Sequence, residues 1–96
     1  MPQVSIKKDS GEVVITVCDS ELFGKKFEEG NFTLEIEESF YGGEEMEMEE
    51  CLETLKEASI GNLVGSIVDH AIEDGIIEPE HVLEIEGVKH AQFVSY

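Results

Sequence analysis

Apolar side chains occupy every second position in much of the first third of the chain, a spacing typical of half-buried β-strands. Residues 3–7 alternate in this way, and residues 12–18 form a β-branched run after an Asp-Ser-Gly turn, so we predict a β-hairpin. A capping Asp or Ser followed by a glycine predicts a short helical turn over residues 19–24. A further strand is predicted over residues 31–37. Its apolar face would consist of Phe32, Leu34 and Ile36.

The spacing of apolar residues changes to three and four after the pair Gly42-Gly43. This spacing predicts an amphipathic helix over residues 44–58, and the glutamates at its beginning suit the positive end of the helix dipole. The same period continues beyond Ser59, which is a good N-cap, whereas Gly61 inside a helix would cost about 1 kcal/mol. We therefore predict a second helix over residues 60–74 rather than one long helix.

The last part of the chain, residues 82–94, is predicted to form a second hairpin around Glu86 and Gly87. Three strands, two helices and two strands in this order predict an α+β fold. We expect a single small domain over residues 1–96, with a mostly antiparallel sheet of about five strands and two helices packed on one face. No apolar run approaches the ~20 residues of a membrane helix, so no association with a membrane is expected.

The composition is strongly acidic: 23 acids and six lysines give a net charge of −17. We interpret this acidity as solubility in a salty or hot cytosol, and the alternative is an acidic face over residues 35–50 that binds a basic partner or a cation. Nucleic-acid binding relies on Lys and Arg, and this chain has no Arg. Direct general binding of nucleic acid is therefore not expected, and only Lys7-Lys8 and Lys25-Lys26 offer a local site.

The two cysteines, Cys18 and Cys51, are 33 positions apart and belong to no Cys-x-x-Cys motif. Both lie in apolar patterns, and the N-terminus carries no secretory segment, so we expect two buried free thiols in a cytoplasmic protein.

Few residues suggest catalysis or metal binding. His70, His81 and His90 are widely spaced, and none belongs to an HExxH motif, so we expect no metal and no cofactor. No Gly-x-Ser-x-Gly elbow surrounds a serine, and neither cysteine has a nearby positive charge, which favours a protein that is not an enzyme. The Gly42-Gly43 pair has the glycines of an anion-binding loop, but the following glutamates would repel phosphate. We interpret it as a turn.

Six segments together resemble a family of small archaeal proteins that is classed only as a domain of unknown function. They are residues 15–19, 22–27, 38–43, 62–65, 71–75 and 87–92. The resemblance extends over nearly the whole chain. It implies a single cytoplasmic domain without an assigned enzymatic activity, for whose relatives a translation or RNA-associated role has been suggested.

The resemblance also marks individual positions. Among them are the glycines Gly24, Gly42, Gly43, Gly65 and Gly87, which backbone requirements explain. The marked residues that we take as candidates for binding a ligand or partner are Lys25, Ser39, Tyr41, Gly42, Gly43, Asn62, His90 and Gln92. Packing in the core gives no reason for four of them, Tyr41, Asn62, His90 and Gln92. We expect a cleft where these four converge.

Three functional hypotheses follow. The first is a non-enzymatic interaction module that binds a protein or ribonucleoprotein partner, in translation for example, through the acidic face and the loop Tyr41-Gly42-Gly43. The alternative is a small-ligand-binding protein or small enzyme with the polar cleft as its site and Lys25 as an anion contact. The third is a homodimer in which an exposed terminal strand pairs with its copy.

Overall fold

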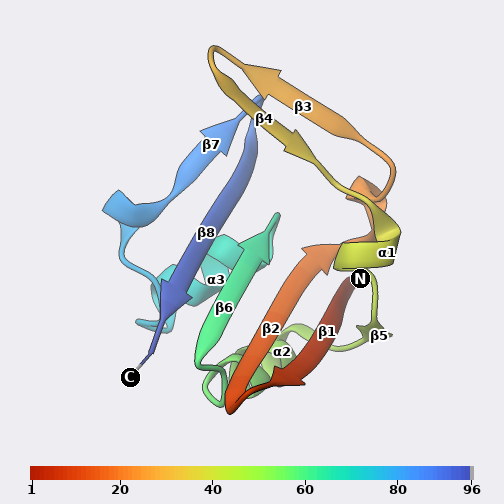
Figure 1. Ribbon diagram of the computed structural model, residues 1–96. Coiled ribbons are helices and arrows are strands. Elements are labelled where there is room, and N and C mark those ends of the chain that lie inside the picture. The colour runs from red at the N-terminus through yellow and green to blue at the C-terminus, as the bar shows by residue number, and fades with distance from the viewer. Residues whose placement is uncertain (96) are drawn as a thin grey trace.

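A six-stranded mixed sheet runs through the molecule, with its strands in the order β5–β1–β2–β6–β8–β7 (Figure 1). The computed structural model describes residues 1–95. The strands of this sheet are β1 (Pro2–Asp9), β2 (Glu12–Asp19), β5 (Glu44–Glu45), β6 (Ile60–Val64), β7 (Leu83–Ile85) and β8 (Val88–Val94). The β2–β6 pair is parallel, and the other neighbours are antiparallel. The predicted α+β class is therefore confirmed, with one parallel pair in the sheet.

The remaining elements lie on the two sides of this sheet. A separate two-stranded sheet consists of β3 (Lys26–Glu29) and β4 (Phe32–Glu35). The helices are α1 (Glu38–Tyr41), α2 (Met48–Leu55) and α3 (Ile67–Glu73), and the short 3-10 turns are η1 (Ser20–Leu22) and η2 (Pro79–His81). No helix within residues 1–95 is long and apolar enough to cross a membrane.

Both predicted hairpins are confirmed, because their turns are specified locally. The turn between β1 and β2 consists of Ser10 and Gly11, whose φ angles are 50° and 85°. Glu86 and Gly87 connect β7 to β8 with φ angles of 49° and 82°. Two consecutive residues with positive φ form the tight turn whose twist matches that of the flanking strands.

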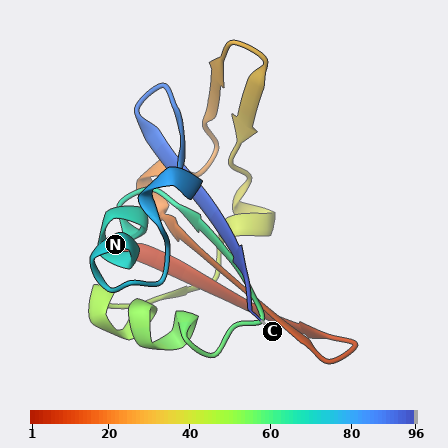
Figure 2. The same ribbon diagram turned by 90° about the vertical axis from the view of Figure 1, so that its left-hand side faces the viewer.

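Helices α2 and α3 cover one face of the sheet, as predicted (Figure 2). Alternate residues of the strands point toward them and form the main core. Its strand residues are Val4, Ile15, Val17, Leu63 and Ala91, and its helix residues are Cys51, Leu55, Ile67, Val68 and Ala71. This side of the sheet is therefore closed to solvent along most of its length.

The opposite face of the sheet is covered at one end only. The β3–β4 hairpin and α1 lie over that end and enclose a second apolar cluster (Figure 2). Leu34 and Ile36 are buried there, as predicted. Phe32 is 54% exposed, which contradicts its predicted place on the buried face. It lies next to the Gly30-Asn31 turn, where the hairpin has passed the edge of the cluster.

The predicted helix over residues 60–74 is wrong in its first part, because Ile60–Val64 is the central strand β6. This strand pairs with β2 on one side and β8 on the other, and its residues Leu63 and Val64 are buried in the apolar clusters on its two faces. A short apolar run buried in this way has no alternation that would separate it from a helix. Gly61 is needed there because a Cβ would overlap the ring of Phe93.

The helix predicted over residues 44–58 is shorter than expected. Residues 44–45 form the edge strand β5, which pairs with β1, and α2 begins only at Met48. Gly43 therefore does not open a helix. Its backbone packs so closely on that of Val4 that a Cβ would overlap the Val4 carbonyl, and its N–H donates a hydrogen bond to Gln3 Oε1 over 3.0 Å.

Strand β8 lies between β6 and β7 in the order of the sheet, and β7 pairs only with its residues 88–90. The edges are the short strands β5 and β7, and β5 carries two exposed glutamates, Glu44 and Glu45. Short, charged edge strands resist pairing with a second chain. A homodimer, through the terminal strand or in another way, stays a prediction.

Candidate functional site

Asn62 and His90 project from neighbouring strands onto the sheet face that α2 and α3 leave uncovered. Asn62 lies on β6 and is 8% exposed, and His90 lies on β8 and is half-buried. The Nε2 atom of His90 lies 2.9 Å from the Asn62 Oδ1 atom. Because this amide oxygen can only accept a hydrogen bond, Nε2 carries the proton and the Nδ1 atom of neutral His90 is an acceptor.

Tyr41, at the end of α1, lies close to Asn62. Burial raises the pKa of the Tyr41 hydroxyl, and a hydrogen bond with the Asn62 side chain opposes part of this increase. Burial lowers the pKa of His90. At neutral pH, Tyr41 is therefore protonated and His90 uncharged, so the three side chains carry no charge.

Three of the four residues expected to form a polar cleft thus converge, although β6, β8 and α1 are distant in the sequence. The fourth, Gln92, is exposed and lies directly opposite Asn62 in the β6–β8 register. The two cavities described for residues 1–95 lie elsewhere and are not lined by these four side chains. A binding role for the four residues stays a prediction.

The other candidate residues lie at the surface, in turns and in the short helix α1. Lys25 is exposed between η1 and β3, where its carbonyl accepts a hydrogen bond from the Ile36 N–H over 2.9 Å. Ser39 is exposed on α1. Gly42 follows α1, and a Cβ there would lie 2.6 Å from the Glu38 carbonyl oxygen. The glycines after Tyr41 are therefore explained by close approaches of backbone, and the binding roles of all these residues stay predictions.

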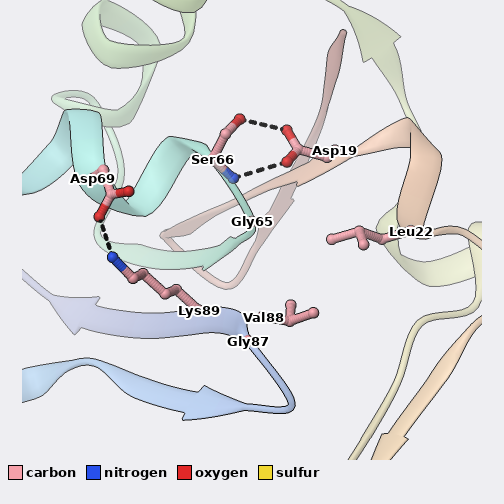
Figure 3. Close-up of a pocket in the computed structure, with 8 residues that line it drawn as sticks. All are labelled: Asp19, Leu22, Gly65, Ser66, Asp69, Gly87, Val88 and Lys89. Atoms are coloured by element: carbon pink, nitrogen blue, oxygen red, sulfur yellow. Dashed lines mark hydrogen bonds and ion pairs between the residues drawn. The ribbon is translucent and has the colours of Figure 1, made fainter.

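A cavity of about 240 Å³ lies at the carboxyl ends of the parallel strands β2 and β6 (Figure 3). The carboxylate of Asp19 accepts hydrogen bonds there from the Ser66 N–H over 2.8 Å and the Ser66 hydroxyl over 2.7 Å. Across the cavity, the Lys89 ammonium lies 2.7 Å from Asp69 Oδ1. Ligands of open sheets often bind at the carboxyl ends of parallel strands, so this position is where a site would be sought.

The polar groups of this cavity are engaged with one another. Asp19 receives both donors of Ser66 at the beginning of α3, and the hydrogen bond to Asp69 raises the pKa of Lys89. We therefore assign this arrangement a structural role. Ser66 and Asp69 were not predicted to lie at a site, because both fall inside the helix predicted over residues 60–74. The signal that would have found them is the Gly65-Ser66 pair, which separates β6 from α3.

The acidic face is fully exposed. All eight of its glutamates are exposed: Glu35, Glu37, Glu38, Glu44, Glu45, Glu47, Glu49 and Glu50. Four ion pairs connect charged groups within residues 1–95, and none of them includes a glutamate of this face. Its charge is therefore not compensated by close contacts within the described part of the chain.

An exposed aromatic ring interrupts the acidic face. Phe40 is 50% exposed, and its ring centroid lies 5.0 Å from that of Tyr41 at an interplanar angle of 69°. The ammonium of Lys7 lies 5.0 Å from the centroid of the Phe40 ring, within the range of a cation–π interaction. Phe40 thus already holds a positively charged group.

The uncovered part of the sheet, next to Phe40, is poor in acids. We call it the open side of the sheet and define it by Ser5, Lys7, Val14, Thr16, Ile60, Asn62, Gln92 and Val94. These residues alternate with the core residues that face α2 and α3, so they point to the opposite side. Lys7 is the one charged residue among them, and the acids Asp9 and Glu12 follow on the same side at the end of the β1–β2 hairpin. In a chain of net charge −17, this surface therefore carries few acids.

Comparison with known families gives one match that spans most of the chain. The family described as "Protein of unknown function (DUF424)" matches residues 7–96. A solved structure, described as that of an uncharacterized conserved protein from Methanopyrus kandleri, is 25% identical with a TM-score of 0.81. It covers 99% of this chain and 93% of its own. No curated protein matches. The expected resemblance to a domain of unknown function is therefore confirmed, and the chain belongs to the DUF424 family.

Proposed function

We propose that this protein is a non-enzymatic interaction module that binds a basic segment of a partner protein along the acidic face and the adjacent open side of the sheet. One observation carries the proposal: residues 35–50 carry eight exposed glutamates without an ion pair in residues 1–95, and the same segment presents an exposed ring, Phe40, that holds an ammonium group.

The eight glutamates are better explained by recognition of a partner than by a role in folding. None of the eight glutamates belongs to either apolar cluster, and neighbouring like charges destabilise the folded chain slightly. A partner rich in Lys and Arg would relieve this repulsion. Complementary charges at the rim of an interface also accelerate association and exclude wrong partners.

The chemistry of the surface favours a protein partner over nucleic acid. The acidic face would repel phosphates, whereas proteins that contact nucleic acid carry many lysines and arginines. Basic proteins of translational and other ribonucleoprotein assemblies are therefore one class of partner to test. In such an assembly, this module would bind the protein component.

The test is an affinity capture from native lysate at matched intracellular salt, with nuclease-treated samples in parallel. A triple variant, Glu37→Gln, Glu38→Gln and Glu44→Gln, removes three of the negative charges of the acidic face. A matched control changes exposed glutamates elsewhere, Glu57→Gln, Glu73→Gln and Glu84→Gln, and alters the net charge equally. We expect basic proteins captured by the wild type and the control but lost with the first variant. Equal capture by both variants, or no basic partner, would contradict the proposal.

A second candidate function, binding of a small polar ligand, is favoured by the convergence of Tyr41, Asn62 and His90. The neutral His90 ring and the exposed Gln92 amide could hydrogen-bond a ligand that lies on the open side of the sheet. The test follows the His90 ring protons by NMR while mixtures of polar metabolites are added. Shifts in the wild type that Gln92→Leu abolishes support this function, and unchanged spectra with all mixtures exclude it for those ligands.

A further inference from the structure

We infer that Phe40 binds an arginine or lysine side chain of the partner, and that Lys7 occupies this position in the unbound protein. The inference rests on the proposed function, because it names the group by which a basic partner would be recognised. It also explains why a cation, Lys7, lies on a surface that is proposed to bind cations.

The Phe40 ring is held in place although it is exposed. It belongs to the short helix α1, which lies over the β1–β2 side of the open sheet face (Figure 1). Its neighbour Tyr41 is half-buried and contacts the Phe40 ring in a T-shaped arrangement. A ring that is fixed on one side and exposed on another can receive a ligand without first being ordered.

Lys7 shows that the ring attracts cations. The chain has 23 acids, yet none of the four ion pairs within residues 1–95 includes Lys7. Its ammonium lies instead over the Phe40 ring, 5.0 Å from the centroid. The side chain comes from β1, on the same side of the sheet as α1, so it reaches the ring from within the open side.

A partner can replace Lys7 because this internal contact is weak. Lys7 is exposed, and a flexible lysine loses rotamer freedom when it is held over a ring. The planar guanidinium of an arginine stacks on an aromatic face and is less strongly hydrated than an ammonium. Exposed Glu37 and Glu38 belong to the same helical segment as the ring, so a partner cation placed there also gains their attraction.

The neighbouring residue Lys8 provides a matched control. Lys7 and Lys8 are consecutive residues of β1, both are exposed, and they point to opposite sides of the sheet. Lys7→Met and Lys8→Met therefore change the net charge equally, but only the first change frees the Phe40 ring.

The experiment measures binding of a fluorescent Arg-Ser repeat peptide by anisotropy at low salt. We expect Lys7→Met to bind about two- to fivefold more tightly than Lys8→Met, which corresponds to one exposed cation–π contact. Phe40→Leu should weaken binding relative to the wild type. In a Phe40→Leu background, the two lysine variants should bind equally. Circular dichroism checks that each variant is folded.

The outcomes separate this inference from the proposed function. If the wild type binds the peptide and Glu37→Gln with Glu38→Gln weakens binding, while Lys7→Met and Lys8→Met remain equal, the inference is overturned and the proposed function stands. If the wild type does not bind the peptide, the inference also fails. The lysate capture then decides the proposed function alone.

Discussion

Replacement of Gly65 by alanine should destabilise the fold by more than its exposure suggests. Gly65 follows β6 and has a φ of 97°, which L-residues rarely adopt. A Cβ at this position would lie 2.5 Å from Asp19 Oδ2 and 3.2 Å from Leu22 Cδ1. The Asp19 carboxylate would therefore have to move away from Ser66.

The magnitude follows from two contributions. Forcing alanine into a positive φ costs about 1–2 kcal/mol. Displacement of Asp19 removes its hydrogen bonds at the beginning of α3, and loss of such a cap costs about 1 kcal/mol. The sum is about 2–3 kcal/mol, a large part of the roughly 5–15 kcal/mol that stabilises a typical domain.

The measurement is urea unfolding followed by circular dichroism, with Gly87→Ala as the matched control. Gly87 has a φ of 82°, but a Cβ there meets no atom within 4 Å, so that only the backbone cost applies. We expect Gly65→Ala to lose about 1 kcal/mol more than Gly87→Ala.

A double-mutant cycle isolates the contribution of Asp19. In an Asp19→Ala background the carboxylate is absent, so Gly65→Ala should lose only the backbone cost. The reasoning is refuted if Gly65→Ala is no more destabilising than Gly87→Ala, or if its effect is the same with and without Asp19.

Two further predictions concern buried titratable groups. Burial lowers the pKa of His90 below its ordinary value of 6.5, so the unfolded chain binds this proton more readily, and stability should fall as the pH decreases below about 6.5. His90→Asn should flatten this part of a stability–pH curve, and an unchanged slope would show that another group is responsible. Burial also raises the pKa of Cys18 to about 12, and Cys51 is buried too. A thiol reagent at about pH 8 should label neither cysteine in the native protein and both after denaturation, whereas fast native labelling would argue against the packing.

The parts of the fold that could be predicted are those whose information is local. The hairpins β1–β2 and β7–β8 follow from alternating side chains on either side of two-residue turns, and each turn contains a glycine at its second position. Leu34 and Ile36 were placed on a buried face correctly, because alternation reports which face a residue belongs to. Alternation does not report where that face ends, which is why Phe32 was misplaced.

Strand β6 shows why the remainder of the fold could not be predicted. Leu63 and Val64 of the strand Ile60–Val64 are buried in apolar clusters on opposite faces of the sheet, so the apolar residues of this run have no period of two. The error removed the parallel β2–β6 pair from the prediction. For the same reason, the cavity at the carboxyl ends of these two strands, where Asp19 accepts hydrogen bonds from Ser66, could not be predicted.

The features of the candidate site also divide into those that the sequence predicted and those that only the tertiary structure decided. Composition and residue order alone determined the acidic face over residues 35–50, the two hairpins and the polar character of Tyr41, Asn62 and His90. Only the tertiary structure decided that these three side chains meet, and that Lys7 lies over Phe40, 33 positions later in the chain. Charge and turn preference are properties of neighbouring residues, whereas these contacts depend on which strands pair and which side of the sheet the helices cover.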